Sequence, residues 1–159
     1  MGRLVAFIFV VVFGITFMLP GHSPGRSGNP HRVTTPSEPA RDTELERSPS
    51  GHFYTHAKVN GELVRFIVDT GADVVALTRD DAERVGLAVD PSRFEVIGEG
   101  ASGPVRGARV KIDSIEVDGK LVNDVDGIVL ADSSLSLLGQ SYLSRISTVQ
   151  MSGDYMVLR

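Results

Sequence analysis

The chain has 159 residues, which suffices for one modest domain with an additional terminal segment but not for two independent cores. Its 16 basic and 20 acidic side chains give a formal net charge of −4, and no run of Lys and Arg occurs, which argues against nucleic acid as a partner. The absence of cysteine excludes disulfides, thiolate nucleophiles and cysteine-based zinc sites.

The N-terminus carries an unbroken apolar run. Only Arg3 precedes the 16 uncharged residues Leu4–Leu19, which would form roughly 24 Å of helix against a hydrocarbon core of about 30 Å. A signal peptide is the alternative to a permanent anchor, but the exit Phe17–His22 lacks the small-x-small pattern of a cleavage site. We therefore predict a membrane anchor over residues 1–21. Arg3 and the α-amino group favour a cytoplasmic N-terminus, so we expect a single-pass protein of the inner (cell) membrane with an extracytoplasmic, periplasmic domain.

Residues 22–51 are rich in Pro, Gly and Ser, and six of the eight prolines lie between residues 20 and 50. A segment of this composition buries too little apolar surface to offset the entropy of ordering it. We predict a flexible tether that spans on the order of 30 Å. After Ser50 the chain has 11 basic and 16 acidic side chains, so the domain has a net charge of −5 and no evident affinity for anionic lipid.

The remaining residues, 52–159, show the pattern of a small β-rich domain. Apolar and polar residues alternate from His52 to Val59, Asn60-Gly61 follows, and a second extended run begins at Leu63. Asn-Gly favours a hairpin with a type I′ turn, and Asp118-Gly119 marks another turn after a long alternating stretch. Short strands at this spacing predict a mostly β sandwich or closed barrel.

Two short helices interrupt the strands. The first is predicted from Thr78 to Val85, with Thr78 as the N-cap and Asp81 at the third helical position in a capping-box arrangement. The second is predicted to follow Gly139 and to run to Ile146.

Asp69 is the most conspicuous candidate for chemistry, because an apolar strand, Phe66–Val68, leads directly into it. A buried, unpaired carboxylate costs several kcal/mol, so Asp69 must be hydrogen-bonded by turn amides, share its site with another acid, or face a cleft. The alternative interpretation is an aspartate that only caps a turn, as Asp-x-Gly sequences commonly do.

The context of Asp69 resembles the active-site loop of retropepsin-like aspartic proteases. Asp69-Thr70-Gly71-Ala72 is followed by the apolar run Val74–Leu77, and Leu137-Leu138-Gly139 precedes the second predicted helix. This pair of motifs resembles the two hallmarks of the family in order and separation. The resemblance covers His52 to Leu158, and the run Leu137–Ile146 is particularly similar to the bacterial membrane-tethered branch of clan AA. It implies a single-lobe, closed β-barrel with one or two short helices, preceded by an N-terminal membrane segment.

The resemblance also implies roles for individual residues. Asp69 would be the catalytic carboxylate, Thr70 would brace the loop across a dimer interface, and Gly71 and Ala72 would complete the turn. Gly139 would allow a close crossing of chains behind the loop, with Leu137 and Leu138 packed beneath it. A flap over the substrate would fall within residues 97–106. Its candidate residues are Ile97, Gly98, Gly100, Ala101 and Gly103, and this segment lacks the aromatic residue found in pepsin flaps.

Aspartic protease chemistry needs two carboxyl groups that share one proton, with one acting as base towards water and the other as acid towards the carbonyl oxygen. The chain has a single Asp-Thr-Gly and about half the length of a two-lobed enzyme. We therefore expect a homodimer in which two copies of Asp69 face each other, with no metal and no cofactor. Tethering two copies to one membrane would raise their effective concentration.

Other motifs do not support a different chemistry. Gly98–Gly103 fits the dinucleotide pattern G-x-G-x-x-G, but Pro104 follows where a helix is required. His52 and His56 lie on one face of a predicted strand, too far apart for a metal pair.

The sequence thus predicts an aspartic endopeptidase that cuts extended polypeptides. Two alternatives are a retropepsin-fold module that binds a peptide or partner without cutting it, and an enzyme that processes only itself.

Overall fold

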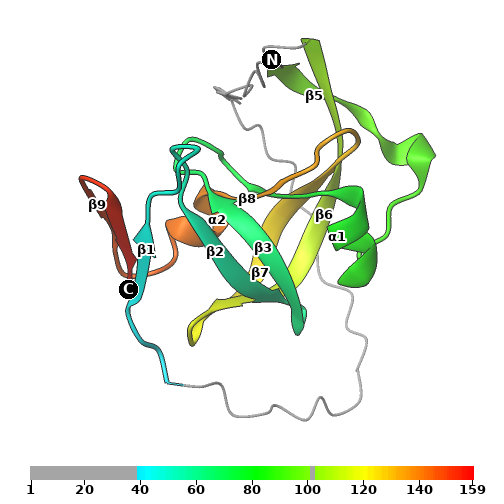
Figure 1. Ribbon diagram of the computed structural model, residues 1–159. Helices are drawn as coiled ribbons and strands as arrows, with labels where there is room; N and C mark the ends of the chain where they lie inside the picture. The colour runs from blue at the N-terminus through cyan, green and yellow to red at the C-terminus, as the bar shows by residue number, and fades with distance from the viewer. Residues whose placement is uncertain (1–38, 101–102) are drawn as a thin grey trace, which may run out of the picture.

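A closed β-barrel forms the body of the domain in the computed structural model, which describes residues 39–100 and 103–159 (Figure 1). The order of the large sheet is β2-β3-β8-β4-β7-β6-β5, and β2 also pairs with β6, which closes six of the strands into a barrel. The predicted barrel is therefore confirmed. The strands are β2 (Tyr54–Val59), β3 (Glu62–Val68), β4 (Val75–Leu77), β5 (Glu95–Gly100), β6 (Gly103–Val117), β7 (Lys120–Leu130) and β8 (Ser136–Leu138).

Two tight hairpins set the register of the barrel. Val59 pairs with Glu62 across Asn60-Gly61, whose φ angles are 51° and 95°. Val117 pairs with Lys120 across Asp118-Gly119, whose φ angles are 45° and 80°. Positive φ at both central residues is the geometry of a type I′ turn, which matches the twist of the flanking strands. Both turns lie where the sequence predicts them.

The helices are short, as predicted. The structure contains α1 (Arg79–Arg84), the 3-10 helix η1 (Pro91–Arg93) and α2 (Gln140–Leu143). The Thr78 hydroxyl accepts from the Asp81 amide at 3.0 Å, as an N-cap does.

The predicted capping box at α1 is modified by β8. The Thr78 amide donates to the Ser136 hydroxyl at 3.1 Å, and that hydroxyl donates to the Asp81 carboxylate at 2.5 Å. The Ser136 hydroxyl of β8 therefore bridges the Thr78 amide and the Asp81 carboxylate, which would bond directly in a simple capping box. The second helix ends at Leu143 rather than at the predicted Ile146.

The interior of the barrel is mostly apolar, but it also contains a tyrosine. Tyr142 of α2 is fully buried, and its hydroxyl donates to the Lys120 carbonyl at 2.8 Å. Burial raises the pKa of Tyr142 well above its ordinary value of 10.0. Around it pack the largest fully buried apolar side chains, namely Phe66, Leu77, Ile112, Ile115, Leu138 and Leu158.

A second, three-stranded sheet joins the two ends of the described chain. It has the order β1-β10-β9, with β1 (Thr43–Glu46), β9 (Val149–Ser152) and β10 (Tyr155–Leu158). The strand β1 falls within the range 22–51, which the sequence predicts to be a flexible tether. Only Thr43 and Leu45 of this four-residue strand are buried, and such a short, charged segment carries too little pattern to be recognised.

Lys120 holds β1 against the barrel. Its ammonium group donates to the Arg41 carbonyl at 2.5 Å and to the Thr43 hydroxyl at 2.9 Å. The Thr43 hydroxyl in turn donates to the Asp118 carboxylate at 2.6 Å. Burial lowers the pKa of Lys120, with the carboxylates of Asp118 and Asp42 opposing that shift. The folded unit therefore includes residues upstream of 52.

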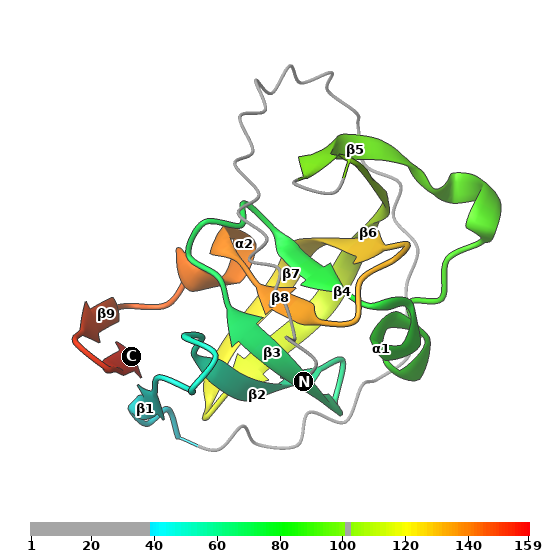
Figure 2. The same cartoon turned by 45° about the horizontal axis from the view of Figure 1, so that its top comes forward.

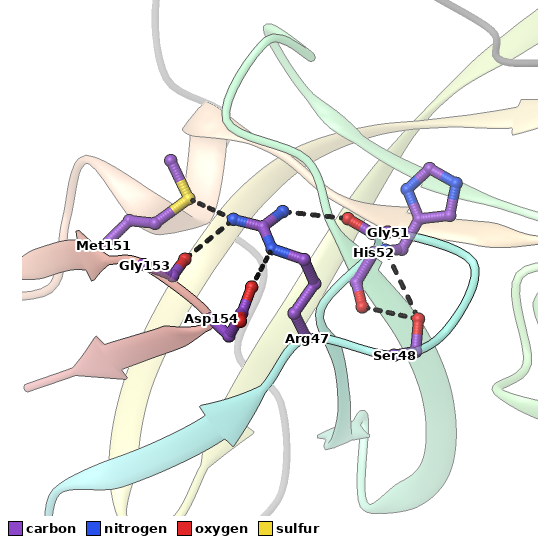
Figure 3. Close-up of polar contacts among 7 residues, drawn as sticks. All are labelled: Arg47, Ser48, Gly51, His52, Met151, Gly153 and Asp154. Atoms are coloured by element: carbon purple, nitrogen blue, oxygen red, sulfur yellow. Dashed lines mark hydrogen bonds and ion pairs between the residues drawn. The ribbon is translucent and has the colours of Figure 1, made fainter.

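Arg47 connects this terminal sheet to the barrel (Figure 3). Its guanidinium donates to the Asp154 carboxylate at 3.2 Å and to the Gly51 and Gly153 carbonyls at 3.0 Å each. It also lies 4.5 Å from the centroid of the Phe53 ring. The Phe53 carbonyl accepts from the Val68 amide at 2.9 Å, so the cluster around Arg47 adjoins the end of β3 that leads into Asp69.

The predicted membrane anchor, residues 1–21, and the first part of the predicted tether, residues 22–38, lie outside the described residues. Within residues 39–100 and 103–159, no helix is long and apolar enough to cross a membrane.

Replacing Tyr142 with Phe tests the buried hydrogen bond. We expect Tyr142→Phe to lower the free energy of unfolding by about 1–2 kcal/mol at pH 7, because the Lys120 carbonyl loses its donor. Above pH 10 the tyrosine ionises in the unfolded chain but keeps its proton in the folded one, so the stability of the wild type falls. The difference in free energy of unfolding between the wild type and Tyr142→Phe therefore becomes smaller.

Urea denaturation at several pH values measures both effects. The control is Tyr155→Phe, at a side chain that is 59% exposed, where we expect a change below about 0.5 kcal/mol. A Tyr142→Phe chain as stable as the wild type at pH 7 would contradict the assigned role of the hydroxyl.

Candidate active site

The Asp69 loop begins where the apolar strand β3 ends. Phe66, Ile67 and Val68 are buried, whereas Asp69 is half-buried and Thr70 is exposed. The Asp69 amide donates to the Leu138 carbonyl at 3.1 Å, which extends the pairing of β3 with β8 by one residue. The backbone at Asp69 is thus fixed, while its side chain emerges at the edge of the core.

Hydrogen bonds inside the loop orient the Asp69 carboxylate. The Gly71 amide donates to Asp69 Oδ1 at 3.0 Å, and the Ala72 amide donates to the Asp69 carbonyl at 3.3 Å. The first bond is the contact that the turn-capping interpretation expects. In the part of the chain that the structure describes, Asp69 Oδ2 accepts no hydrogen bond, so this oxygen is available to a water molecule or a second acid.

The strand β8 lies between the two strands that flank the loop (Figure 2). It runs parallel to β3, with Leu137 opposite Ile67 and Leu138 opposite Val68. It also pairs with β4 in the antiparallel sense, with Leu137 opposite Ala76. The two motifs of the sequence, Asp69–Ala72 and Leu137–Gly139, therefore meet in the fold although nearly seventy residues separate them.

Gly139 lies against the backbone of the loop. A Cβ atom at this position would be 2.3 Å from the Val74 carbonyl oxygen and 2.8 Å from the Ala72 carbonyl oxygen. Real Cβ atoms do not approach backbone atoms so closely, so no other residue fits without moving the loop. The two residues after Gly139 complete the crossing, since the Gln140 amide donates to the Ala72 carbonyl at 2.8 Å and the Ser141 amide donates to the Asp73 carbonyl at 3.0 Å.

Two side chains that support the loop are not predicted from the sequence. Gln140 Nε2 donates to the Thr70 carbonyl at 2.7 Å. The Ser141 hydroxyl accepts from the Val75 amide at 2.9 Å and donates to the Asp126 carbonyl at 2.7 Å. Their position directly after Leu137–Gly139 is the only signal that would have drawn attention to them. Thr70, by contrast, has a hydroxyl without a hydrogen bond among the described residues.

An apolar pocket adjoins the loop. Its walls include Ala72, Asp73 and Val74 of the loop, Ile97 and Val105 of the β5–β6 hairpin, and Ile128 of β7. The hairpin packs closely on itself, because a Cβ atom at Gly107 would be 2.6 Å from Ile97 Cδ1. The hairpin and the loop thus enclose one space between them.

The predicted flap residues lie on this hairpin. Ile97, Gly98 and Gly100 belong to β5, and Gly103 begins β6. Ala101 lies outside the described residues. The pairing shifts register between Val96 and Gly98, which is a bulge of the kind that bends a strand. Within residues 39–100 and 103–159, no group of three or more His, Asp or Glu side chains is placed to hold a metal ion.

Comparison with known proteins assigns the family. The model of the family described as "gag-polyprotein putative aspartyl protease" matches residues 55–145, a range that contains both motifs. The chain belongs to the retropepsin-like aspartic proteases. A crystal structure of a retropepsin-like aspartic protease from Rickettsia conorii is 31% identical and has a TM-score of 0.61, covering 74% of this chain and 88% of that chain.

Two further relatives extend the comparison of this retropepsin-like chain. A Sinorhizobium sp. protein described as "Uncharacterized protein in cobV 5'region" is 35% identical over 144 residues, which make up 89% of this chain and 60% of that protein. "Uncharacterized protein RP867" of Rickettsia prowazekii (strain Madrid E) is 32% identical over 114 residues, which make up 72% of this chain and 49% of that protein. The match therefore spans only about half to three-fifths of the length of these two relatives.

Replacing Gly139 with Ala tests whether the site depends on the close contact between Gly139 and the backbone of the Asp69 loop. We expect Gly139→Ala to lower the free energy of unfolding by about 3 kcal/mol or more, because the new atom meets two carbonyl groups of the retropepsin loop. Thermal and urea denaturation measure the change.

The control for this variant is Gly153→Ala. At Gly153 nothing lies within 4 Å of an added carbon and φ is +57°, so only conformational strain of about 1 kcal/mol applies. Equal losses at the two positions would show that steric contact at Gly139 is not what the site depends on.

Proposed function

We propose that this retropepsin-like chain is an aspartic endopeptidase that hydrolyses peptide bonds with a water molecule held between the Asp69 carboxyl groups of two identical chains. One observation carries the proposal. The Asp69 side chain is oriented by the Gly71 amide and its backbone by the Leu138 carbonyl, while Oδ2 is without a hydrogen bond among the described residues. A carboxylate held in this way is suited to chemistry rather than to packing.

The chemistry requires a second copy of the chain. The ionised Asp69 of one chain removes a proton from the water molecule, and the water oxygen attacks the peptide carbonyl carbon. The protonated Asp69 of the other chain donates its proton to the carbonyl oxygen. The tetrahedral intermediate then breaks at the C–N bond, and the amine leaves with a proton taken from the dyad. Each chain has one Asp-Thr-Gly, so a twofold homodimer is the simplest assembly that supplies both groups.

Thr70 is the residue we assign to the interface. Its side chain is exposed, and its carbonyl is held by the Gln140 side chain at 2.7 Å. Because the backbone at Thr70 is already fixed, its exposed hydroxyl can donate a hydrogen bond to a second chain without further ordering of the loop. This keeps the entropy cost of dimerisation low.

The substrate would lie between the loop and the β5–β6 hairpin. We propose that an extended polypeptide enters this space as an additional strand, with its side chains alternating between the pocket and solvent. The hairpin residues Ile97 and Val105 would then act as the flap.

For the cellular setting we propose a membrane-anchored enzyme. The apolar run Leu4–Leu19 would be the anchor, and the Pro-, Gly- and Ser-rich residues that follow would hold the domain on the extracytoplasmic, periplasmic side. Confinement to one membrane surface would raise the effective concentration of the chains and favour the dimer.

Removing the proton-accepting oxygen tests the catalytic assignment. We expect Asp69→Asn to abolish cleavage of an unstructured polypeptide while leaving the thermal midpoint within a few degrees of the wild type, since the amide keeps an oxygen for the Gly71 amide. The control Asp126→Asn removes an exposed carboxylate that pairs with Lys111 among the described residues, and we expect it to retain activity. Cleavage by Asp69→Asn at the wild-type rate would overturn the assignment.

The same cleavage assay separates the two alternative functions. A wild-type chain that binds peptides but never cuts them would be a catalytically silent module. A chain that cuts only its own tether would be limited to self-processing.

Mixing wild-type and Asp69→Asn chains tests the shared site. A mixed dimer has a single ionisable Asp69, so with a ninefold excess of the variant we expect activity per wild-type chain to fall to about one tenth after subunit exchange. Sedimentation velocity on the same samples checks that the mass is that of two chains. Activity unchanged by mixing, or an active monomer, would contradict the dimeric site.

A further inference from the structure

Arg109 is among the residues that line the pocket beside the Asp69 loop, and three further arginines lie close to Phe94 or to the Arg109 backbone. We propose that the preferred substrate is an acidic peptide, in which an aliphatic side chain fills this pocket and a neighbouring carboxylate pairs with Arg109. This inference rests on the proposed peptide-cleaving function and specifies its substrate class.

The pocket itself selects an aliphatic side chain. Its volume is about 100 Å³, and its surface is almost wholly apolar. An apolar protein cavity that holds a benzene molecule measures roughly 150 Å³, so the smaller space suits Val, Ile or Leu better than an aromatic ring. Apolar walls also reject a charged group at this position, because desolvating it would be uncompensated.

Arg109 places a positive charge at this pocket. It lies on β6 opposite Ile128, and it is the basic residue among those that line the pocket. Side chains alternate along a strand, so Arg109 shares its face of β6 with Val105 and Gly107, and Gly107 lies directly beneath Ile97. The Arg109 side chain is exposed and can reach a bound peptide.

Three more arginines contact either Phe94 or the Arg109 backbone. Arg93 donates to the Arg109 carbonyl at 3.4 Å, Arg106 donates to the Phe94 carbonyl at 3.0 Å, and the Arg79 guanidinium lies 5.6 Å from the Phe94 ring centroid. We call Arg79, Arg93, Arg106 and Arg109 the Phe94 arginine group. Both views place α1, β5 and β6 on the same side of the barrel (Figures 1 and 2).

This group forms no close ion pair in the part of the chain that the structure describes. In the described ranges none of its four members lies within 4 Å of an Asp or Glu oxygen, whereas six other basic side chains do. Asp90, in the same segment, is bonded to the Ser92 hydroxyl and amide, and those bonds lower its pKa, with a smaller contribution from the charge of Arg93. Glu95 and the pocket residue Asp73 are exposed and form no ion pair with the group. Within a domain of net charge −5, a substrate carboxylate is the partner that these arginines lack.

Matched peptides test the preference with the full-length protein. The peptides share an uncharged, aliphatic sequence and differ by Glu, Gln or Lys at one position at a time, from four residues before the cleaved bond to four after it. An exposed Arg–carboxylate pair is worth roughly a two- to five-fold change in kcat/KM. We expect Glu to exceed Gln by about this factor at one or more positions, with Lys lowest, and the ratio to shrink between 0.05 and 0.5 M NaCl.

Charge variants assign the preference to Arg109. We expect Arg109→Gln to equalise the Glu and Gln peptides, and Arg109→Glu to make the Lys peptide the best substrate. The control Arg65→Gln removes the same charge from β3, where the guanidinium lies 4.2 Å from the Tyr54 ring centroid, and should keep the wild-type preference.

The outcomes separate this inference from the proposed function. Cleavage of all peptides with no advantage for Glu, or an advantage that persists in Arg109→Gln, overturns the inference and leaves the peptidase assignment intact. If no peptide is cut, fluorescence anisotropy with the Asp69→Asn chain still measures binding. Tighter binding of Glu peptides that is lost on adding Arg109→Gln supports the inference, and equal or absent binding overturns it.

Discussion

The close contact between Gly139 and the backbone of Ala72–Val74 is the constraint on which the site depends. Because no side chain separates the two segments, β8 can lie between β3 and β4 and exchange main-chain hydrogen bonds with the loop. Main-chain bonds hold a loop more rigidly than contacts between flexible side chains, since fewer torsions must be ordered. The Asp69 carboxylate thereby gains a fixed direction at little cost in stability.

The fold assigns different tasks to neighbouring surfaces. The barrel interior is apolar and supplies stability, the loop after β3 presents a carboxylate, and the pocket between loop and hairpin presents apolar walls. The side chains of the Phe94 arginine group are exposed, and one of them, Arg109, also lines the pocket. A site with a single carboxylate is chemically incomplete, so the same arrangement that orients Asp69 also requires a second chain for catalysis.

The terminal sheet shows how distant segments secure the barrel. Lys120 is buried, which disfavours its charge, but its hydrogen bonds to the Arg41 carbonyl and the Thr43 hydroxyl offset that cost and position β1. Arg47 then ties the turn between β9 and β10 to Gly51 and Phe53.

The sequence by itself determined the local features of this protein. Alternation and the Asn60-Gly61 and Asp118-Gly119 turns define two hairpins, and Thr78 defines the start of a helix, because hydrogen bonds and φ preferences act between residues close in the chain. Only the tertiary structure decided which strand lies beside β3, that β1 belongs to the domain, and that Arg79 and Arg106 both contact Phe94. Such juxtapositions follow from the packing of the whole barrel, and local sequence carries little information about them.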